Sequence, residues 1–472
     1  MRLPPFWSAH PGHACGALLG LVALLPACSD GEDAESDKPT FQPSMVARTP
    51  STPGSRGFLD RRGLIHAHSV YSHDACDGEP RDPGTDAINA PCLQDFRDGV
   101  CATQHDFVML TDHNESFARS EYPDVLLHDA KKGDQLLERG GGPVANWLAC
   151  PDGSKTLILA GTETETMPVG LEGHVADTPE ERSAVYGAKT PEALATLKAQ
   201  GAVSLLQHTE DWTVDELSTM PIDGFEMYNL HANTFAGAAA VFGLVGKVPQ
   251  PELLPHSDLV IAPIFNEDPA YLSRWGGTLA RGVKRVTTMG TDCHRNSIPG
   301  LLPDGERIDS YRRMMIWFSN HLLVSPGTDG GYDDLSLKEA LRAGRLYGAF
   351  EYLGYPDGFD FHAESADKIH EMGAELKLSA GVTLSATAPA VLGLSKADAQ
   401  PTLRTVVYRA KADGWDQVAD GGKSVTFSVD KTGAYRVEVR MVPKHLKKFL
   451  VSYSDLAEQE FVWIYSNAIY VR

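Results

Sequence analysis

Short apolar segments alternate with amphipathic stretches from residue 63 to about residue 352. The apolar segments have the length of buried strands and lie at 63–68, 106–111, 156–162, 202–207, 224–228, 259–264 and 286–291. Helical periodicity lies between several of them, for example over 191–200 and 231–245. This alternation favours parallel strands joined by helical crossovers. The pattern therefore predicts a barrel-like α/β domain over residues 61–355.

The pattern changes after about residue 356. Apolar and polar residues then alternate with a period of two over 376–387, 402–410, 424–429, 434–441 and 461–471. Gly, Pro and Asp separate these stretches, and helical periodicity is rare. The sequence predicts a small β-rich, sandwich-like domain over 356–472. An irregular extension of the barrel is the alternative.

The first 60 residues differ from the rest of the chain. An apolar run over 17–25 ends in Leu25-Pro26-Ala27-Cys28, and Arg2 is the only charged residue before Asp30. The run is too short to cross a bilayer as a mature helix and is typical of an export signal. Its end resembles the lipobox of bacterial lipoproteins, although ordinary cleavage near Ala27 is the alternative.

These features predict a signal peptide over 1–28 and a lipid anchor on Cys28. The following residues are rich in Asp, Glu, Ser, Thr and Pro, which predicts a flexible tether over 29–60. We expect the protein in the bacterial cell envelope, in the periplasm or at the outer membrane or cell surface, with the lipid as its membrane attachment.

Charge and cysteine content narrow the function classes. The formal net charge of −21 is spread along the chain without a Lys/Arg-rich block, which predicts no binding to nucleic acid. Four cysteines, Cys76, Cys92, Cys101 and Cys150, lie in or near predicted loops and insertions. In an oxidising compartment they predict two disulfides, and all three pairings stay open.

Side chains that bind metals follow the predicted strands at their C-terminal ends. His66 and His68 are two residues apart on a strand and therefore face one side. Imidazole suits borderline divalent metals, and sites in barrel folds form at this edge. The other candidate segments are Ser72-His73-Asp74, Thr111-Asp112-His113, Gly161-Thr162-Glu163, His174, His208 and Thr291-Asp292-Cys293-His294. The sequence therefore predicts a metal site at this edge.

The ordered segments HAHSVYSHD, TDH, GTE, QH and GTDCH span His66 to His294. This series resembles the PHP (polymerase and histidinol phosphatase) superfamily of metal-dependent hydrolases. The segments 340–347, 435–440 and 463–472 are more loosely similar to its carbaryl-hydrolase-like (CehA/McbA) branch, which adds a β-rich tail. The resemblance implies a distorted seven-stranded (β/α) barrel with two or three divalent ions, Mn, Zn or Fe.

The resemblance also implies three groups of ligands. The first consists of His66, His68, Glu163 and Asp292. The second consists of His73, His113 and His294, with Asp74 as the rival of His73. The third consists of Glu163, His174 and His208, so that Glu163 bridges. Cys293 lies between two inward-facing ligands and should pack outward as a small apolar residue.

Asp292, His231 and Arg295 are the candidates for catalytic roles. His231 follows a predicted strand at the edge of the site, and Arg295 either binds an anionic group or forms an ion pair. We expect a hydrolase in which a metal-bound hydroxide attacks a small, anionic phosphoester. Hydrolysis of a carboxylic or carbamic ester is the first alternative. A non-catalytic metal- or partner-binding surface lipoprotein is the second.

Overall fold

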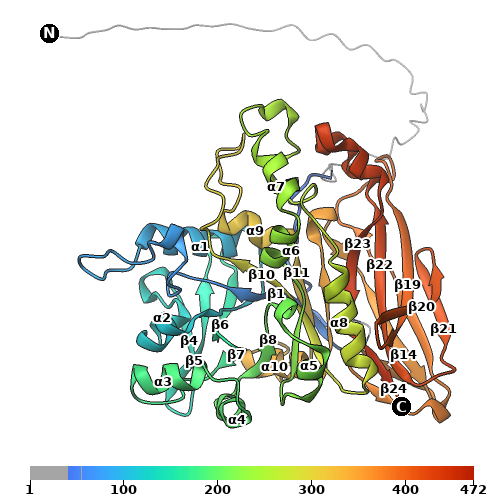
Figure 1. Cartoon of the computed structure of the whole chain (residues 1–472), viewed down its shortest axis with the longest axis horizontal. Helices are drawn as coiled ribbons and strands as arrows, with labels where there is room; N and C mark the ends of the chain where they lie inside the picture. The colour runs from blue at the N-terminus through green and yellow to red at the C-terminus, as the bar shows by residue number, and fades with distance from the viewer. Residues whose placement is uncertain (1–40, 55) are drawn as a thin grey trace, which may run out of the picture. The chain divides into compact units, whose positions relative to one another are not determined.

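Seven strands close into a barrel (Figure 1). The computed structural model describes residues 41–54 and 56–472. Neighbouring strands around the barrel are β1 (Leu59–Ala67), β2 (Phe107–Met109), β6 (Lys155–Glu163), β7 (Met167–Leu171), β8 (Val203–Leu206), β9 (Gly224–Asn229) and β10 (Val286–Cys293), and β10 pairs with β1.

The expected (β/α) barrel is wrong. Such a barrel has parallel strands that are each followed by a helix, whereas β7 runs antiparallel to both β6 and β8. Only residues 164–166 connect β6 to β7, which is too short for a helical crossover. The chain is about 29% helix and 32% strand, and further strands lie outside this mixed barrel.

Helices form most of the other connections around the barrel. Helix α1 (Ala90–Ala102) joins β1 to β2, and α3 (Pro179–Tyr186) and α4 (Pro191–Ala199) join β7 to β8. Helix α5 (Val214–Thr219) joins β8 to β9, and α6 (Leu230–Ala236), α7 (Ala238–Val245) and α8 (Pro269–Ala280) join β9 to β10. Helix α4 begins where the Thr190 side chain accepts from the Ala193 amide and Pro191 fixes the first turn.

The strand predicted at 259–264 is also wrong. A short 3-10 helix, η6 (Ser257–Leu259), is followed there by a turn, and Val260 and Ile261 are buried without a strand partner. A short apolar run indicates burial, but it does not distinguish a strand from another buried segment.

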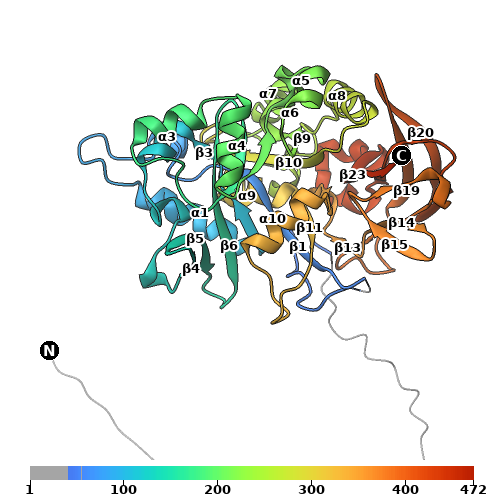
Figure 2. The ribbon, with the colours of Figure 1, turned by 90° about the horizontal axis from the view of Figure 1, so that it is seen from below.

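The barrel sheet continues into the C-terminal region (Figure 2). Strand β11 (Ser319–Val324) pairs antiparallel with β1, and β12 (Leu346–Ala349) pairs with β11. Strand β12 in turn pairs with β23 (Phe461–Ser466), and β23 pairs with β22 (Gly433–Val442). Strand β22 pairs with β19 (Thr402–Lys411), which pairs with β20 (Gly414–Gly421). The C-terminal strands thus extend the sheet that begins at β1.

Two further elements are a hairpin and a separate small sheet. The insertion after α2 (Asn114–Arg119) forms a hairpin of β4 (Gln135–Arg139) and β5 (Gly142–Ala149) that pairs with β6. A four-stranded antiparallel sheet contains β15 (Lys368–Glu371), β14 (Asp360–Ser365), β17 (Thr383–Thr387) and β21 (Ser424–Ser428). Strand β21 contacts β19 and β20, so this sheet lies against the C-terminal end of the main one.

The predicted signal peptide, the lipid anchor on Cys28 and the start of the predicted tether lie outside the described residues. From Phe41 onward the chain lies on the folded unit: the Phe41 ring is 5.0 Å from the His445 ring. The Thr49 hydroxyl donates to the Asp106 carboxylate. Within 41–54 and 56–472, no helix has both the length and the apolar composition needed to cross a bilayer.

The structure selects one of the three disulfide pairings. Cys76 pairs with Cys92 and Cys101 pairs with Cys150. The first bond ties the loop after β1 to helix α1, and the second ties the end of α1 to the segment after β5. The loop that carries the candidate ligand Asp74 is therefore covalently held against a helix.

Candidate metal centre

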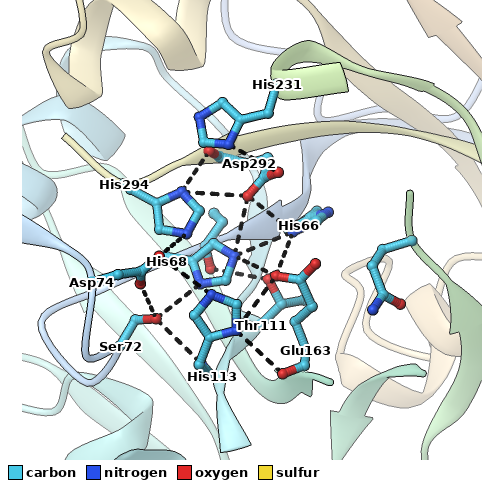
Figure 3. Close-up of polar contacts among 12 residues, drawn as sticks. His66, His68, Ser72, Asp74, Thr111, His113, Glu163, His231, Asp292 and His294 are labelled. Carbon is cyan, nitrogen blue, oxygen red and sulfur yellow. Dashed lines mark hydrogen bonds and ion pairs between the residues drawn. The ribbon is translucent and has the colours of Figure 1, made fainter. Parts of the chain in front are cut away.

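Candidate ligands meet where several barrel strands end. His66 and His68 come from the end of β1, and Glu163 ends β6. His113 ends the short strand β3 (Asp112–His113), which pairs with β6. Asp292 and His294 come from the end of β10. Figure 3 shows these side chains pointing toward one another.

The first predicted ligand group is assembled. The Nε2 atom of His66 lies 3.2 Å from Glu163 Oε2 and 3.2 Å from Asp292 Oδ1. The Nε2 atom of His68 lies 3.1 Å from Glu163 Oε2 and 3.3 Å from Asp292 Oδ1. The two Nε2 atoms are 3.2 Å apart. A tetrahedral ion with bonds of about 2.0–2.1 Å spaces its ligand atoms about 3.3–3.4 Å apart, so this group has the spacing of a metal site.

Two buried atoms of the ligand groups lie close to other ligand atoms but make no contact of hydrogen-bond geometry among the described residues. They are Asp292 Oδ1 and His294 Nε2. A buried polar atom without a partner is costly, and native structures contain few of them. Both atoms belong to groups of side chains that can hold a metal ion. The donor set therefore fits a divalent cation.

A second group of side chains that could hold a metal ion includes Asp74. Its Oδ2 atom lies 3.4 Å from His113 Nε2 and 3.2 Å from His294 Nε2. His68 lies close enough to complete a group of four. The Ser72 hydroxyl donates to the other Asp74 oxygen over 3.0 Å and orients this carboxylate. His73, which the resemblance favoured, is exposed, and its ring centre is 5.0 Å from that of His113.

The third predicted group is incomplete in this structure, because His174 makes its hydrogen bonds outside the cluster. Glu163 Oε1 lies 2.9 Å from His208 Nε2, so these two residues do meet. Both ring nitrogens of His174 are used elsewhere: one bonds the Tyr186 hydroxyl over 2.9 Å and the other donates to the Ser120 carbonyl over 2.7 Å. A histidine with both nitrogens hydrogen-bonded to such groups has no lone pair left for a metal.

Electrostatics keep the carboxylates charged. Burial opposes ionisation of Glu163, but the neighbouring histidines outweigh it and hold its pKa well below its ordinary value. The pKa of Asp292 is likewise lowered despite burial, chiefly by His66. Burial also opposes protonation of His66, yet Asp292, Glu226 and Glu163 raise its pKa well above its ordinary range. The cluster thus favours added positive charge, which a metal ion supplies.

Glu226 is a site residue that the sequence reasoning missed. This glutamate on β9 is fully buried, and its Oε1 accepts from His66 Nδ1 over 2.7 Å. The contact fixes the ring so that Nε2 presents its lone pair to the cluster. A Cβ at Gly290 would clash with this carboxylate, so glycine leaves the necessary space. The signal in the sequence is a lone glutamate within the apolar strand Gly-Phe-Glu-Met-Tyr.

The three remaining predicted residues lie at different distances from the cluster. His231 Nδ1 is 3.3 Å from Asp292 Oδ2, and its ring stacks on that of His294 with centres 5.1 Å apart. Arg295 forms an ion pair with Asp95 of α1 over 3.1 Å, which is its predicted alternative role. Cys293 is buried within the apolar core and is not in a disulfide.

Three residues of the cluster have left-handed backbone conformations. The φ angles are 84° at His66, 49° at His208 and 52° at Asp292. Such angles are uncommon for residues other than glycine, and they concentrate at functional sites. At His66 the pairing of β1 with β10 shifts register, so simple strand alternation does not describe the ligand positions.

A polar cleft of about 440 Å³ opens beside the cluster. Glu163 and His208 line it, together with four more carboxylates, Glu165, Glu210, Asp211 and Glu216. Lys189, which also lines it, pairs with Glu165 over 3.1 Å. The lining of this cleft is therefore predominantly acidic.

Comparison of the chain with known protein families, with curated proteins and with solved structures found no match. The resemblance to the PHP superfamily therefore stays a prediction. Independently of it, the structure shows His, Asp and Glu side chains in groups that could hold a metal ion.

Proposed function

We propose that the protein is a metal-dependent hydrolase that cleaves an ester bond of a small molecule. The observation that carries this proposal is the first ligand group, in which two imidazole nitrogens and two carboxylate oxygens have the spacing of a tetrahedral site. Bound divalent ions supply water that ionises near neutral pH and charge that stabilises the transition state. Mn, Zn and Fe are the candidate ions, because histidine and carboxylate ligands suit them.

The chain's own residues have three tasks in this proposal. His66, His68, Glu163 and Asp292 would hold one ion. Asp74, His113 and His294 would hold a second ion, and His68 lies beside it. Glu226 orients His66 through the 2.7 Å hydrogen bond. The complete ligand groups support two ions, and the third group lacks one of its three predicted ligands, because His174 is hydrogen-bonded elsewhere.

His231 is placed to move a proton. Its Nδ1 faces the Asp292 carboxylate at 3.3 Å, which orients the ring. Its Nε2 is buried and has no hydrogen-bond partner among the described residues. A histidine oriented by a carboxylate through one nitrogen can carry a proton on the other. We assign to His231 Nε2 the protonation of the leaving group.

Two bond classes compete. A phosphoester is the first candidate, because paired ions can hold its oxygens through an in-line displacement. The acidic lining of the cleft favours a second candidate, an uncharged carboxylic or carbamic ester. Carboxylates such as Glu165 and Glu210 would repel phosphate oxygens that do not contact the ions.

The proposal is tested with purified full-length protein that is stripped with a chelator and reloaded with Mn, Zn or Fe. We expect about two metal equivalents by elemental analysis, one for each complete ligand group. Hydrolysis is then measured on phosphomonoesters, phosphodiesters and carboxylic and carbamic aryl esters. Less than one equivalent of every metal would refute the metal site. Metal binding without turnover on any ester would instead support the non-catalytic metal-binding alternative.

A further inference from the structure

A second cavity, apolar in character, adjoins the metal centre on the side of His231. It has a volume of about 260 Å³ and lies between α6, α7, the loop 297–308 and α9 (Tyr311–Trp317). Its apolar lining includes Leu230, Val241, Ile264, Ile298, Met314 and Trp317. It differs in this respect from the acidic cleft, which opens beside Glu163 and His208.

Most polar groups that line this cavity are already hydrogen-bonded. Asp309 accepts from the amides of Ser297 and Ile298 over 2.7 and 2.8 Å. The Thr234 hydroxyl donates to the Leu230 carbonyl, and the Trp317 indole donates to the Asp258 carbonyl. Among the described lining residues, only the Nε2 atom of His231 is buried without a partner.

His231 connects this cavity to the metal centre. One of its nitrogens faces Asp292, and the same side chain forms part of the cavity wall. Figure 3 shows the other nitrogen pointing away from Asp292. A bond cleaved next to Asp292 would therefore place one of its two substituents at the opening of an apolar cavity.

We infer that this cavity binds an apolar group of the ester substrate, on the leaving-group side of the bond that is cleaved. The inference rests on the proposed hydrolase function and adds the class of substrate. Transfer of an apolar group from water into an apolar cavity is favourable, and burial of that group supplies binding energy. The cavity exceeds the roughly 150 Å³ that accommodates benzene, so one six-membered ring or a short branched alkyl group fits.

Helix α7 forms the outer wall of this cavity. Ala238, Val241 and Phe242 line it, and the Phe242 ring is 76% exposed at its rim. Ala239 neighbours Ala238 on the same helix but is exposed and does not line the cavity. This pair allows one substitution that fills the cavity and a matched substitution that does not.

The test compares esters that differ only in apolar bulk. Isopropyl and cyclohexyl acetate, and isopropyl and cyclohexyl phosphate, have similar secondary-alcohol leaving groups. With Mn- or Zn-loaded full-length protein, we expect kcat/KM for the cyclohexyl ester to exceed that for the isopropyl ester by about tenfold or more. A ratio near one in the wild-type protein would overturn the inference while leaving the hydrolase function intact.

Variants of α7 then test whether the preference for the cyclohexyl ester depends on this cavity. Ala238→Phe should lower the cyclohexyl-to-isopropyl ratio to near one, because the added ring fills the cavity. Ala239→Phe should leave the ratio unchanged. Phe242→Ala, at an exposed position that does not threaten folding, should lower the ratio by a smaller factor. An unchanged ratio in Ala238→Phe, or an equal fall in Ala239→Phe, would overturn the assignment of the cavity.

A binding measurement separates the two proposals. If none of the four esters is hydrolysed, the proposed function fails, but the cavity is still testable with cyclohexanol as the probe. Saturation-transfer NMR on the full-length protein should detect cyclohexanol binding in the wild type and in Ala239→Phe. Loss of this signal in Ala238→Phe supports the cavity as the apolar site, and its persistence there refutes it.

Discussion

Strand β1 carries a buried polar cluster at each end, and the two clusters differ in how their charges are balanced. At its beginning, Arg62 pairs with Glu351, and His321 lies between Asp60 and Glu351. At its end, His66 and His68 face Glu163 and Asp292. Among the described residues, no arginine or lysine side chain contacts the carboxylates of this second cluster.

The difference separates a cluster whose charges are balanced within the protein from one that could hold a metal ion. In the first cluster, Arg62 Nε donates to Glu351 over 2.7 Å, and Ser319 and Tyr347 donate to Glu351 and Asp60. The protein thus provides its own cation. In the second, Asp292 Oδ1 and His294 Nε2 have no hydrogen-bond partner among the described residues. Burial of several carboxylates without a cation is unfavourable, and the side chains of this cluster form groups that could hold a metal ion.

The largest effect is expected from substitutions in the second cluster. Asp292→Ala removes a ligand of the first ion and the partner of His231, so we expect hydrolytic activity to fall by more than about a thousandfold with loss of bound metal. His294→Ala should behave similarly, while both proteins stay folded because the core lies beneath the strand ends. Activity assays and elemental analysis check this.

Cys293→Ala is the control, since this thiol is buried in the core between the two ligands. It should keep its activity with a modest loss of stability. An inactive Cys293→Ala beside active Asp292→Ala and His294→Ala would show that the facing of this strand end is misassigned.

The next largest effect is expected from a substitution in the first cluster. Glu351→Ala leaves the buried guanidinium of Arg62 without its carboxylate, so we expect the free energy of unfolding to fall by about 3 kcal/mol. Metal content and activity of the folded fraction should stay near wild type. Urea denaturation and elemental analysis measure the two quantities. If Glu351→Ala kept its stability but lost metal, the first cluster would contribute to metal binding, and the distinction between the two clusters would be wrong.

A smaller effect is expected from Glu226→Gln, which weakens the orientation of His66 without removing a ligand. Metal affinity should fall by about 10- to 100-fold, as for other groups that orient metal-binding histidines. Competition with a chelator of known affinity measures this. Glu138→Gln, at an exposed position on β4, is the matched control and should bind metal like the wild type. Equal affinities in both variants would refute the role of Glu226.

The smallest effect concerns how the stability contributed by the first cluster depends on pH. Burial opposes protonation of His321, but Asp60 and Glu351 outweigh it and raise its pKa to about 9. A raised pKa means that the charged ring stabilises the fold fully below about pH 6.5 and that this contribution is lost as pH rises through 9. In metal-free protein, His321→Gln should therefore lower the free energy of unfolding more at pH 6 than at pH 10.

Metal binding has the opposite dependence on pH, because the histidine ligands must lose their protons. Stabilisation of the wild type by added Zn should thus grow between pH 5 and 7. Urea titrations at each pH, with and without metal, measure both trends. A cost of His321→Gln that is independent of pH would show that its ring stays neutral in the folded protein.

Local sequence patterns located most of the strands and the candidate ligands. The predicted segments 63–68, 156–162, 224–228 and 286–291 overlap β1, β6, β9 and β10. Apolar runs of strand length indicate buried segments. The histidines and carboxylates that follow them indicate the edge of the barrel at which ligands lie close together. His66, His68, Glu163 and Asp292 are therefore identifiable from the order of residues along the chain.

The tertiary structure decided the remaining features. The reversed direction of β7, which makes the barrel mixed, depends on its pairing with β6 and β8. The position of Asp74 beside His113 and His294 depends on a loop that Ser72 and the Cys76–Cys92 bond hold in place. Glu226 reaches His66 only because the closed barrel brings β9 and β1 to the same interior. Each feature depends on contacts between residues far apart in the chain, and local periodicity contains no information about such contacts.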